Sequence, residues 1–326
     1  MKKILITGFS GFVSRHFLDY LYKENYRYQI LGVDINPPKI SLEKYKERLH
    51  IEFKELNLLD KEAFDSVIKD FRPDYILHLA SFSSVAYSWK YPADCFNNNT
   101  QIFLNLTESL RNNDLTECRI LSVGSSEEYG NVTEEQLPLH ENMQLTPVSP
   151  YAVARVSQEM MSKVLVDGYG MNIILTRSFN HIGPYQDTRF VIPSFVKRIL
   201  DVVESGAVKG VIETGDTSIV RDFLDVRDVV RAYYLLLTEG MPGEVYNICS
   251  GKGVSLIDII AEIADLLSVE IEGQVNPEFV RPGDNQKIVG SYEKIHRELN
   301  WKPEIPLSQT LQDMIQDMRG AYISES

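Results

Sequence analysis

The sequence has little positive charge and no long apolar run. Its 326 residues carry 33 Lys and Arg against 46 Asp and Glu, which gives a formal net charge of −13. This balance argues against a nucleic-acid partner and against a polybasic patch that would hold a membrane surface. Apolar runs such as Lys3–Thr7 and Tyr75–Ala80 are far shorter than the ~20 residues that span a bilayer. With no signal-peptide pattern either, we expect a cytoplasmic protein.

Cysteines are few, and linker-like composition is absent. Cys95, Cys118 and Cys249 are an odd number, lie far apart and form no CxxC pair. This pattern favours reduced, buried thiols over a disulfide framework, and no metal site is expected. The sequence has no internal repeat or Gly/Ser linker, and its 44% hydrophobic content supports a sizeable core.

The first half of the chain alternates short apolar runs with stretches of helical spacing. Strands are expected at Lys3–Thr7, Tyr28–Val33, Leu49–Glu55, Tyr75–Ala80, Arg119–Val123 and Asn172–Ser178. Helices are expected at Gly11–Glu24, Lys61–Phe71, Pro92–Asn112 and from Pro150 onward. This alternation predicts βαβ units, and therefore an α/β fold with a Rossmann-type, doubly wound parallel sheet.

The second half has shorter strands, more Gly and Pro, and clusters of charge. Val245–Cys249 is predicted to be a strand that returns to the main sheet, and Ser255–Leu267 an amphipathic helix. We expect a smaller, discontinuous α/β domain that binds the substrate. The cofactor domain would be residues 1–178 plus about 221–250, and the substrate domain about 179–220 and 251–326.

A glycine pattern follows the first expected strand. Gly8 and Gly11 stand between that strand and the first helix, with Ser14 where a third glycine is usual. Gly8 allows the tight turn, and Gly11 lets the backbone approach a pyrophosphate at the helix N-terminus. The alternative is a plain strand–helix turn.

Asp34 ends the second expected strand, where a carboxylate accepts hydrogen bonds from a ribose 2′-hydroxyl and repels a 2′-phosphate. No arginine follows directly, so NAD(H) is expected in preference to NADP(H). The alternative is a turn aspartate. By position, Asn57 and Leu58 would flank the adenine, and Leu79 and Ala80 the middle of the cofactor.

Tyr151 and Arg155 are four residues apart in the helix that begins at Pro150, so they lie on one helix face. A cation there stabilises a tyrosinate, which would let Tyr151 exchange a proton with a sugar hydroxyl or ketone. Ser125, at the end of the fifth strand, could donate a hydrogen bond to the same oxygen. The alternative is an ordinary Tyr/Arg pair on a helix surface.

Over almost its whole length the sequence resembles the extended short-chain dehydrogenase/reductases that act on nucleotide sugars. The motifs that carry the resemblance are Gly8-x-x-Gly11, His78-Leu79-Ala80, Asn99, Ser125-Ser126-Glu127, Tyr151-x-x-x-Arg155, Arg177-x-Phe179-Asn180-His181-x-Gly183-Pro184, Arg221-Asp222-Phe223-x-Asp225-Val226-x-Asp228, Arg281-Pro282-Gly283-Asp284 and Trp301-Lys302-Pro303. The most similar subgroups are the GDP-6-deoxy-4-keto-hexulose reductases and the GDP-mannose 4,6-dehydratases.

The resemblance implies functional residues of three kinds. The catalytic residues would be Ser125, Glu127, Tyr151 and Arg155. The cofactor would be held by Gly8, Ser10, Gly11, Phe12, Val13, Asp34, Asn57, Leu58, Leu79, Ala80, Ser81, Asn99, Tyr151 and Arg155. The substrate would be held by Ser84, Ser126, Asn180, Val191, Lys197, Arg221 and Arg281. For Lys197 a solvated helix face is an equal alternative, and His78 and His181 are expected to be structural.

The implied activity is reduction of a 4-keto-6-deoxy nucleotide sugar, GDP-linked, at C4. The first alternative is a 4,6-dehydratase or C4 epimerase with tightly bound NAD, in which Glu127 would be the base. The second is a cofactor-binding pseudoenzyme, because Arg155 replaces the family's lysine and Ser14 its third glycine.

A homodimer is also expected. The helix after Tyr151 carries an apolar stripe wider than one sheet contact requires, formed by Val153, Val156, Met160, Val164 and Leu165. The resemblance implies that this helix and the Phe96–Leu110 helix pair with those of a second copy into a four-helix interface. The alternative is that these side chains face the protein's own core. Trp89 and Trp301 are expected to be packing residues.

Overall fold

The computed structural model describes residues 1–279 and 285–325. Its main sheet has seven parallel strands in the order β10-β6-β5-β4-β1-β2-β3. The strands are β1 (Lys3–Thr7), β2 (Tyr28–Asp34), β3 (Leu49–Glu55), β4 (Tyr75–His78), β5 (Arg119–Ser125), β6 (Ile173–Ser178) and β10 (Val245–Ile248). The predicted doubly wound sheet is confirmed, including the returning strand β10, which pairs with β6 at the edge.

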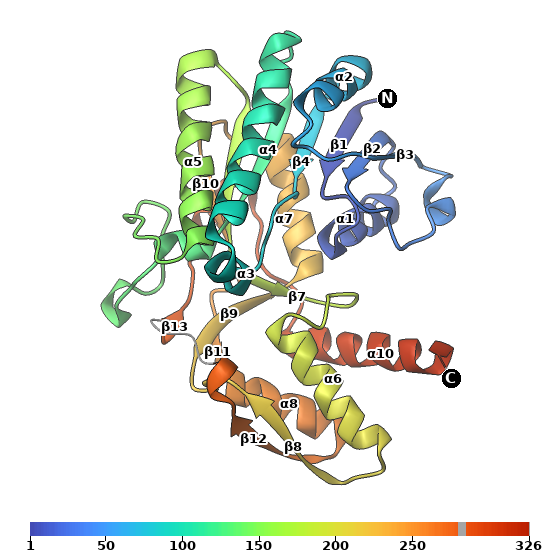
Figure 1. The fold of residues 1–326 in the computed structure, drawn as a ribbon, viewed down its shortest axis with the longest axis vertical. Helices are drawn as coiled ribbons and strands as arrows, with labels where there is room; N and C mark the ends of the chain where they lie inside the picture. Colours follow the sequence, from blue (N-terminus) through green and yellow to red (C-terminus); the bar gives the residue numbers. More distant parts are fainter. Residues whose placement is uncertain (280–284, 326) are drawn as a thin grey trace.

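Helices cover both faces of this sheet (Figure 1). Helices α1 (Phe12–Lys23) and α7 (Val226–Glu239) pack on one face; α2 (Lys61–Phe71), α4 (Pro92–Asn112) and α5 (Pro150–Tyr169) pack on the other. Side chains of a strand alternate between the faces. Ile4 and Ile6 therefore join the α1/α7 core, whereas Leu5 joins the α2/α4/α5 core. A short helix, α3 (Val85–Lys90), precedes α4.

A third apolar core lies in the lower part of Figure 1. It is formed by α6 (Val191–Glu204), α8 (Leu256–Leu267) and α10 (Leu307–Glu325), with the parallel pair β8 (Lys209–Thr214) and β12 (Glu270–Val275). Helix α8 is present where the sequence predicted an amphipathic helix, and Ser255 caps it by accepting the Asp258 amide proton. Its helices and strands fall within segments 179–220 and 251–326, for which the sequence predicts a substrate domain, and that role stays a prediction.

A second small sheet lies between the two parts. It contains β7 (Asn180–Ile182), β9 (Val220–Asp225), β11 (Gly253–Ser255) and β13 (Lys287–Ile288). Helix α9 (Glu293–Leu299) follows, and Ile295 and Trp301 pack into the α1/α7 core rather than the third one. The chain thus crosses between the parts more often than the predicted division, which stays a prediction. Short 3-10 helices lie at Glu43–Tyr45, Ser126–Tyr129, Glu134–Gln136 and Pro277–Phe279.

Three buried aspartates of the charged 221–228 segment hold loops together. Asp222 accepts the amide protons of Ser250, Gly251 and Gly290. Asp225 accepts the Thr310 hydroxyl proton and pairs with Arg227, whose guanidinium also reaches Asp313. Asp228 accepts the amide protons of Glu304 and Ile305. Since buried carboxylates need such donors, these residues have structural roles.

Several further expectations can be compared with the structure. The three cysteines are free and buried, as predicted. Trp301 is fully buried, but Trp89 is 59% exposed, so its predicted packing role is wrong. In the α5 stripe Val156 and Leu165 face the protein's own core, whereas Val153, Met160 and Val164 are exposed. Over residues 1–279 and 285–325, no helix is both long and apolar enough to cross a bilayer.

Candidate active site

The loop between β1 and α1 leaves no room for a side chain at Gly8. Gly8 has φ +70°, and a Cβ on it would lie 2.8 Å from the Ala80 nitrogen. The amides of Gly8 and Phe9 donate to the Val33 carbonyl, and the Gly11 amide donates to the Gly8 carbonyl. The loop therefore turns tightly across the ends of β1, β2 and β4.

Helix α1 begins directly after this loop. Its N-cap is Gly11, which offers no side chain to the free amides of the first turn, and no acidic residue lies in that turn. Free amides at a helix N-terminus attract an anion. Ser14 is completely buried in place of the third glycine, and its hydroxyl has no partner among the described residues.

The end of β4 is tied to the end of β1. The Thr7 hydroxyl lies 2.8 Å from Nδ1 of His78 and accepts the Ala80 amide proton at 3.3 Å. Burial, and then the charge of Arg155, lower the pKa of His78 to about 3, so its ring is neutral at physiological pH. His78 is structural, as predicted, and it sets the position of Leu79 and Ala80 beside Gly8.

Asp34 lies at the end of β2, as the sequence predicted. Its carboxylate accepts the amide protons of Ser10, at 3.0 Å, and Asn36, at 3.2 Å. These contacts turn the carboxylate toward the glycine loop. Asn57 is exposed and caps its own turn by accepting the Leu59 amide proton, whereas Leu58 is buried.

These features fit the expected dinucleotide. A glycine cradle that a Cβ would fill, an uncapped helix N-terminus and a carboxylate at the second strand all meet at the carboxyl edge of a parallel sheet. This is where open α/β sheets bind nucleotides. Phe12 and Val13 form the first turn of α1. Asn99, by contrast, is buried and bonds both backbone groups of Phe82, so its immediate partner is the loop after β4.

The end of β5 carries the second group of expected residues. Ser125 accepts the Glu127 amide proton at 3.2 Å, and the adjoining 3-10 helix contains Ser126 and Glu127. Glu128 turns inward, and its Oε1 accepts the Ser125 amide proton at 2.7 Å. Gly124 makes room for this carboxyl group, because a Cβ there would lie 2.4 Å from Oε1. Burial, and then the Glu159 carboxylate, raise the pKa of Glu128.

Helix α5 brings the tyrosine and the arginine together. Ser149 caps the helix by accepting the Ala152 amide proton, and Pro150 is its first residue, as predicted. Nε of Arg155 donates to the Tyr151 hydroxyl at 3.2 Å, and both side chains are buried. The guanidinium also donates to the Val123 carbonyl, at 3.0 Å, which places it against the end of β5. The predicted Tyr/Arg contact is therefore present in the structure.

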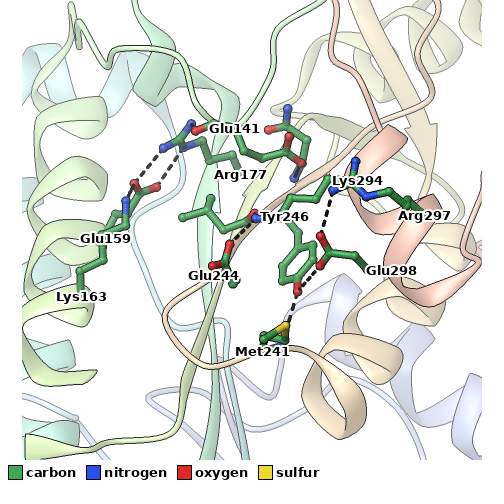
Figure 2. A network of polar contacts seen from close by, with 12 residues as sticks. Glu141, Glu159, Lys163, Arg177, Met241, Glu244, Tyr246, Lys294, Arg297 and Glu298 are labelled. Atoms are coloured by element: carbon green, nitrogen blue, oxygen red, sulfur yellow. Dashed lines mark hydrogen bonds and ion pairs between the residues drawn. The ribbon is translucent and has the colours of Figure 1, made fainter. Parts of the chain in front are cut away.

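A buried ion pair fastens the same helix to β6. Arg177 donates to both carboxylate oxygens of Glu159, at 2.8 and 2.9 Å, and Lys163 adds a further contact (Figure 2). Burial opposes the charge of Glu159, but hydrogen bonds from Arg177 and Lys163 hold its pKa below the usual value. Arg155 lies about one turn, and Tyr151 about two turns, along α5 from this pair.

The expected substrate residues lie on separate elements. Asn180 is on β7 and Arg221 on the adjoining β9, so the small second sheet places them on neighbouring strands. Ser84 is the N-cap of α3. Val191 and Lys197 are exposed on α6, where Lys197 pairs with Asp201 at 3.2 Å. Arg281 lies outside the described residues.

Two polar residues of the site were not predicted from the sequence. The Glu128 carboxyl group accepts the Ser125 amide proton, and the Gln158 side chain accepts a proton from Arg155 from the next turn of α5. Nothing in their spacing separates them from surface residues, because a Glu after Glu127 and a Gln three residues after Arg155 are both common on exposed helix faces. In the described part of the chain no group of His, Cys, Asp and Glu residues could hold a metal ion.

Fold and site together define a Rossmann-type dehydrogenase/reductase. The family model for GDP-mannose 4,6-dehydratase matches residues 5–314. The GDP-6-deoxy-D-mannose reductase of Pseudomonas aeruginosa is 32% identical over 324 residues, which cover 99% of each chain. A dTDP-glucose 4,6-dehydratase of Haemophilus influenzae is 26% identical and covers 97% of each chain.

Solved structures agree with the sequence relatives. RMD from Pseudomonas aeruginosa, complexed with NADPH, matches with a TM-score of 0.83 and 30% identity over 98% of this chain and 100% of that one. A UDP-glucose 4-epimerase from Thermotoga maritima, with UDP-glucose, matches with a TM-score of 0.85 and 29% identity over 98% and 99%. The chain belongs to the GDP-mannose 4,6-dehydratase family, an enzyme family, and the resemblance inferred from its motifs is confirmed.

Replacing Gly8 by Ala should weaken dinucleotide binding. Alanine at φ +70° is strained by about 1–2 kcal/mol, and its Cβ would meet the Ala80 nitrogen at 2.8 Å, which pushes the loop away from β4. Fluorescence titration with NADH should show a loss of affinity of about 10-fold or more. Gly168→Ala is the matched control, because Gly168 lies on an exposed stretch of α5 with no atom within 4 Å of its Cβ position. Equal affinity of the two variants would contradict the assignment of the loop.

Proposed function

We propose that the protein reduces the C4 ketone of a GDP-linked 4-keto-6-deoxy sugar. The observation that supports this best is the hydrogen bond from Nε of Arg155 to the Tyr151 hydroxyl, at 3.2 Å, at the carboxyl edge of the sheet. The similarity to a named GDP-6-deoxy-D-mannose reductase over 99% of both chains favours reduction over the alternatives.

Each residue has a defined part in this proposal. Bound NADH would supply the hydride that reduces C4. The Tyr151 hydroxyl would donate its proton to the sugar O4, and the charge of Arg155 would stabilise the tyrosinate that remains. Ser125 accepts the Glu127 amide proton, which leaves its own hydroxyl proton available for the same sugar oxygen. Asn180 and Arg221, on neighbouring strands, would hold the sugar and its phosphates.

A dehydratase is the second candidate. Glu127 is half-buried in the 3-10 helix after Ser125, where it could remove a proton from C5 of the sugar. The family model and the Haemophilus relative both carry the name of a 4,6-dehydratase. In that reaction NAD would be regenerated in each cycle, so purified protein would retain the cofactor and consume no NADH.

The test separates the two reactions and the pseudoenzyme. The protein is incubated with GDP-mannose and with GDP-4-keto-6-deoxymannose, each with and without NADH, and the products are identified by mass spectrometry. We expect the protein to reduce GDP-4-keto-6-deoxymannose but not GDP-mannose, only when NADH is present, with one NADH consumed per product. Tyr151→Phe removes the proton donor and should lower kcat by about 10²–10⁴-fold. Dehydration of GDP-mannose would establish the second candidate instead, and cofactor binding without any turnover would establish the pseudoenzyme.

NAD(H) is proposed as the preferred cofactor. A 2′-phosphate would lie against the Asp34 carboxylate, and like charges 4 Å apart near a protein surface repel by ~1–4 kcal/mol. By titration calorimetry, NADH should therefore bind at least about 10-fold more tightly than NADPH. Asp34→Asn keeps one acceptor oxygen for the Ser10 amide and removes the charge, so it should narrow this difference. Tighter binding of NADPH, the cofactor in the Pseudomonas RMD structure, would contradict the proposal.

We also propose a homodimer through α5, in the cytoplasm, where its free cysteines stay reduced. Val153, Met160 and Val164 are 42%, 57% and 59% exposed on one helix, an apolar strip that a second copy would cover. Met160→Glu would bury an unpaired charge in that interface and should give the monomer mass in light scattering at micromolar concentration. Met241→Glu, at an equally exposed methionine outside α5, is the control and should stay dimeric. A monomeric parent protein would reject the interface.

A further inference from the structure

The guanidinium of Arg155 is held by neutral groups. It donates to the Tyr151 hydroxyl at 3.2 Å, the Val123 carbonyl at 3.0 Å, Gln158 Oε1 at 2.9 Å and the Ser81 hydroxyl at 2.5 Å. None of the ion pairs among the described residues joins Arg155 to a carboxylate. Neutral acceptors satisfy a buried cation without cancelling its charge.

The other fully buried arginine differs in this respect. Arg177 is paired with both oxygens of Glu159, so its charge is neutralised inside the core (Figure 2). Glu159 is the fourth residue after Arg155 in α5. A carboxylate lies within one helical turn of Arg155, yet it is used by a different cation.

Gln158 is the residue that fixes the second arm of the Arg155 guanidinium. Its side chain is 3% exposed, and its amide is oriented without ambiguity. Arginine has no acceptor, so the amide oxygen must face Arg155, and the amide nitrogen then donates to the Ser122 hydroxyl at 2.8 Å. Ser122 is in β5, whose last residue is Ser125. One amide therefore links the strand that carries Ser125 to the cation beside Tyr151.

We propose that Gln158 is a positioning residue for the reaction: its amide fixes Arg155 beside the Tyr151 hydroxyl while leaving the charge of Arg155 to the tyrosine. This inference rests on the proposed function, in which Tyr151 donates the proton. It also explains how an arginine works where the family has a lysine. A planar guanidinium has a second arm that an ammonium lacks, and Gln158 and Ser81 satisfy the nitrogens that do not face Tyr151.

Two substitutions of Gln158 separate two effects: loss of its contact with Arg155, and neutralisation of the Arg155 charge. Methionine has a length similar to glutamine but only a weakly accepting sulfur, so in Gln158→Met the guanidinium loses one strong contact and shifts from Tyr151. Misplacement of a catalytic group by about 1 Å lowers rates by up to ~10²-fold, and we expect kcat to fall about 10-fold or more with KM for the ketosugar unchanged within about twofold. Gln158→Glu keeps the acceptor but adds a charge that pairs with Arg155. It should keep the urea midpoint of unfolding and still lower kcat about 10-fold or more.

A rescue experiment tests whether the effect runs through Arg155. In the Arg155→Lys background the ammonium has no second arm to hold, so adding Gln158→Met should change kcat less than about twofold. Ser157→Ala is the control, because Ser157 is on the same helix, is half-buried, and its hydroxyl donates to the Val153 carbonyl instead of contacting Arg155. It should leave kcat unchanged. Equal losses from Gln158→Met in both backgrounds, or kcat within twofold of wild type for Gln158→Met and Gln158→Glu, would overturn the inference.

The inference can fail separately from the proposed function. If the wild-type protein turns over no nucleotide sugar, the proposed function is wrong, but urea unfolding of the four proteins in the Arg155/Gln158 cycle still tests the contact. Residues that share a hydrogen-bond network give non-additive changes. We expect the midpoint shift of the double variant to be smaller than the sum of the two single shifts. Additive shifts would show that Gln158 does not hold Arg155.

Discussion

The position of the site depends on one buried ion pair. Arg177, in the fully buried strand β6, and Glu159, in α5, bond through two parallel contacts. Desolvation of both charges is expensive, and only good geometry with further hydrogen bonds offsets it. Here Lys163 and the Glu141 carbonyl supply them. The pair therefore fixes the rotation of α5 about its axis, and every side chain on its inner face, including Tyr151 and Arg155, follows from that rotation.

The same helix keeps two cations under different electrostatic conditions. The charge of Arg177 is neutralised by the Glu159 carboxylate, and this pair joins α5 to β6. The charge of Arg155, in contrast, is surrounded by hydroxyl, carbonyl and amide oxygens. Burial is the main reason that the pKa of His78 is lowered, and the charge of Arg155 lowers it further. A preorganised, un-neutralised cation in a buried site is what stabilises charge that develops on a nearby oxygen. Glu159 pairs with Arg177 and not with Arg155. The charge of Arg155 is therefore left to the Tyr151 hydroxyl, as the proposed function requires.

Much of this arrangement could be predicted from the sequence. The sheet followed from short apolar runs that alternate with stretches of helical spacing, and the contact of Tyr151 with Arg155 followed from their spacing in one helix. Contacts that depend on tertiary packing could not. In the sequence, Glu128 and Gln158 resemble surface residues. Only the packed structure shows the Glu128 carboxyl group against Gly124 and the Gln158 amide against Ser122 of β5. The packing role predicted for Trp89 was wrong, because the short helix α3 leaves this side chain 59% exposed.

The edge position of β10 has a consequence for how the chain folds. Strand β6 is buried along its whole length, but its outer edge pairs with residues that follow β7, α6, β8, β9 and α7 in the sequence. A nascent chain that has completed β6 still exposes an apolar strand edge, which is a template for aggregation. The sheet closes only after the segment with Asn180, Lys197 and Arg221 has been made. The two parts of the molecule must therefore fold together rather than in the order of synthesis.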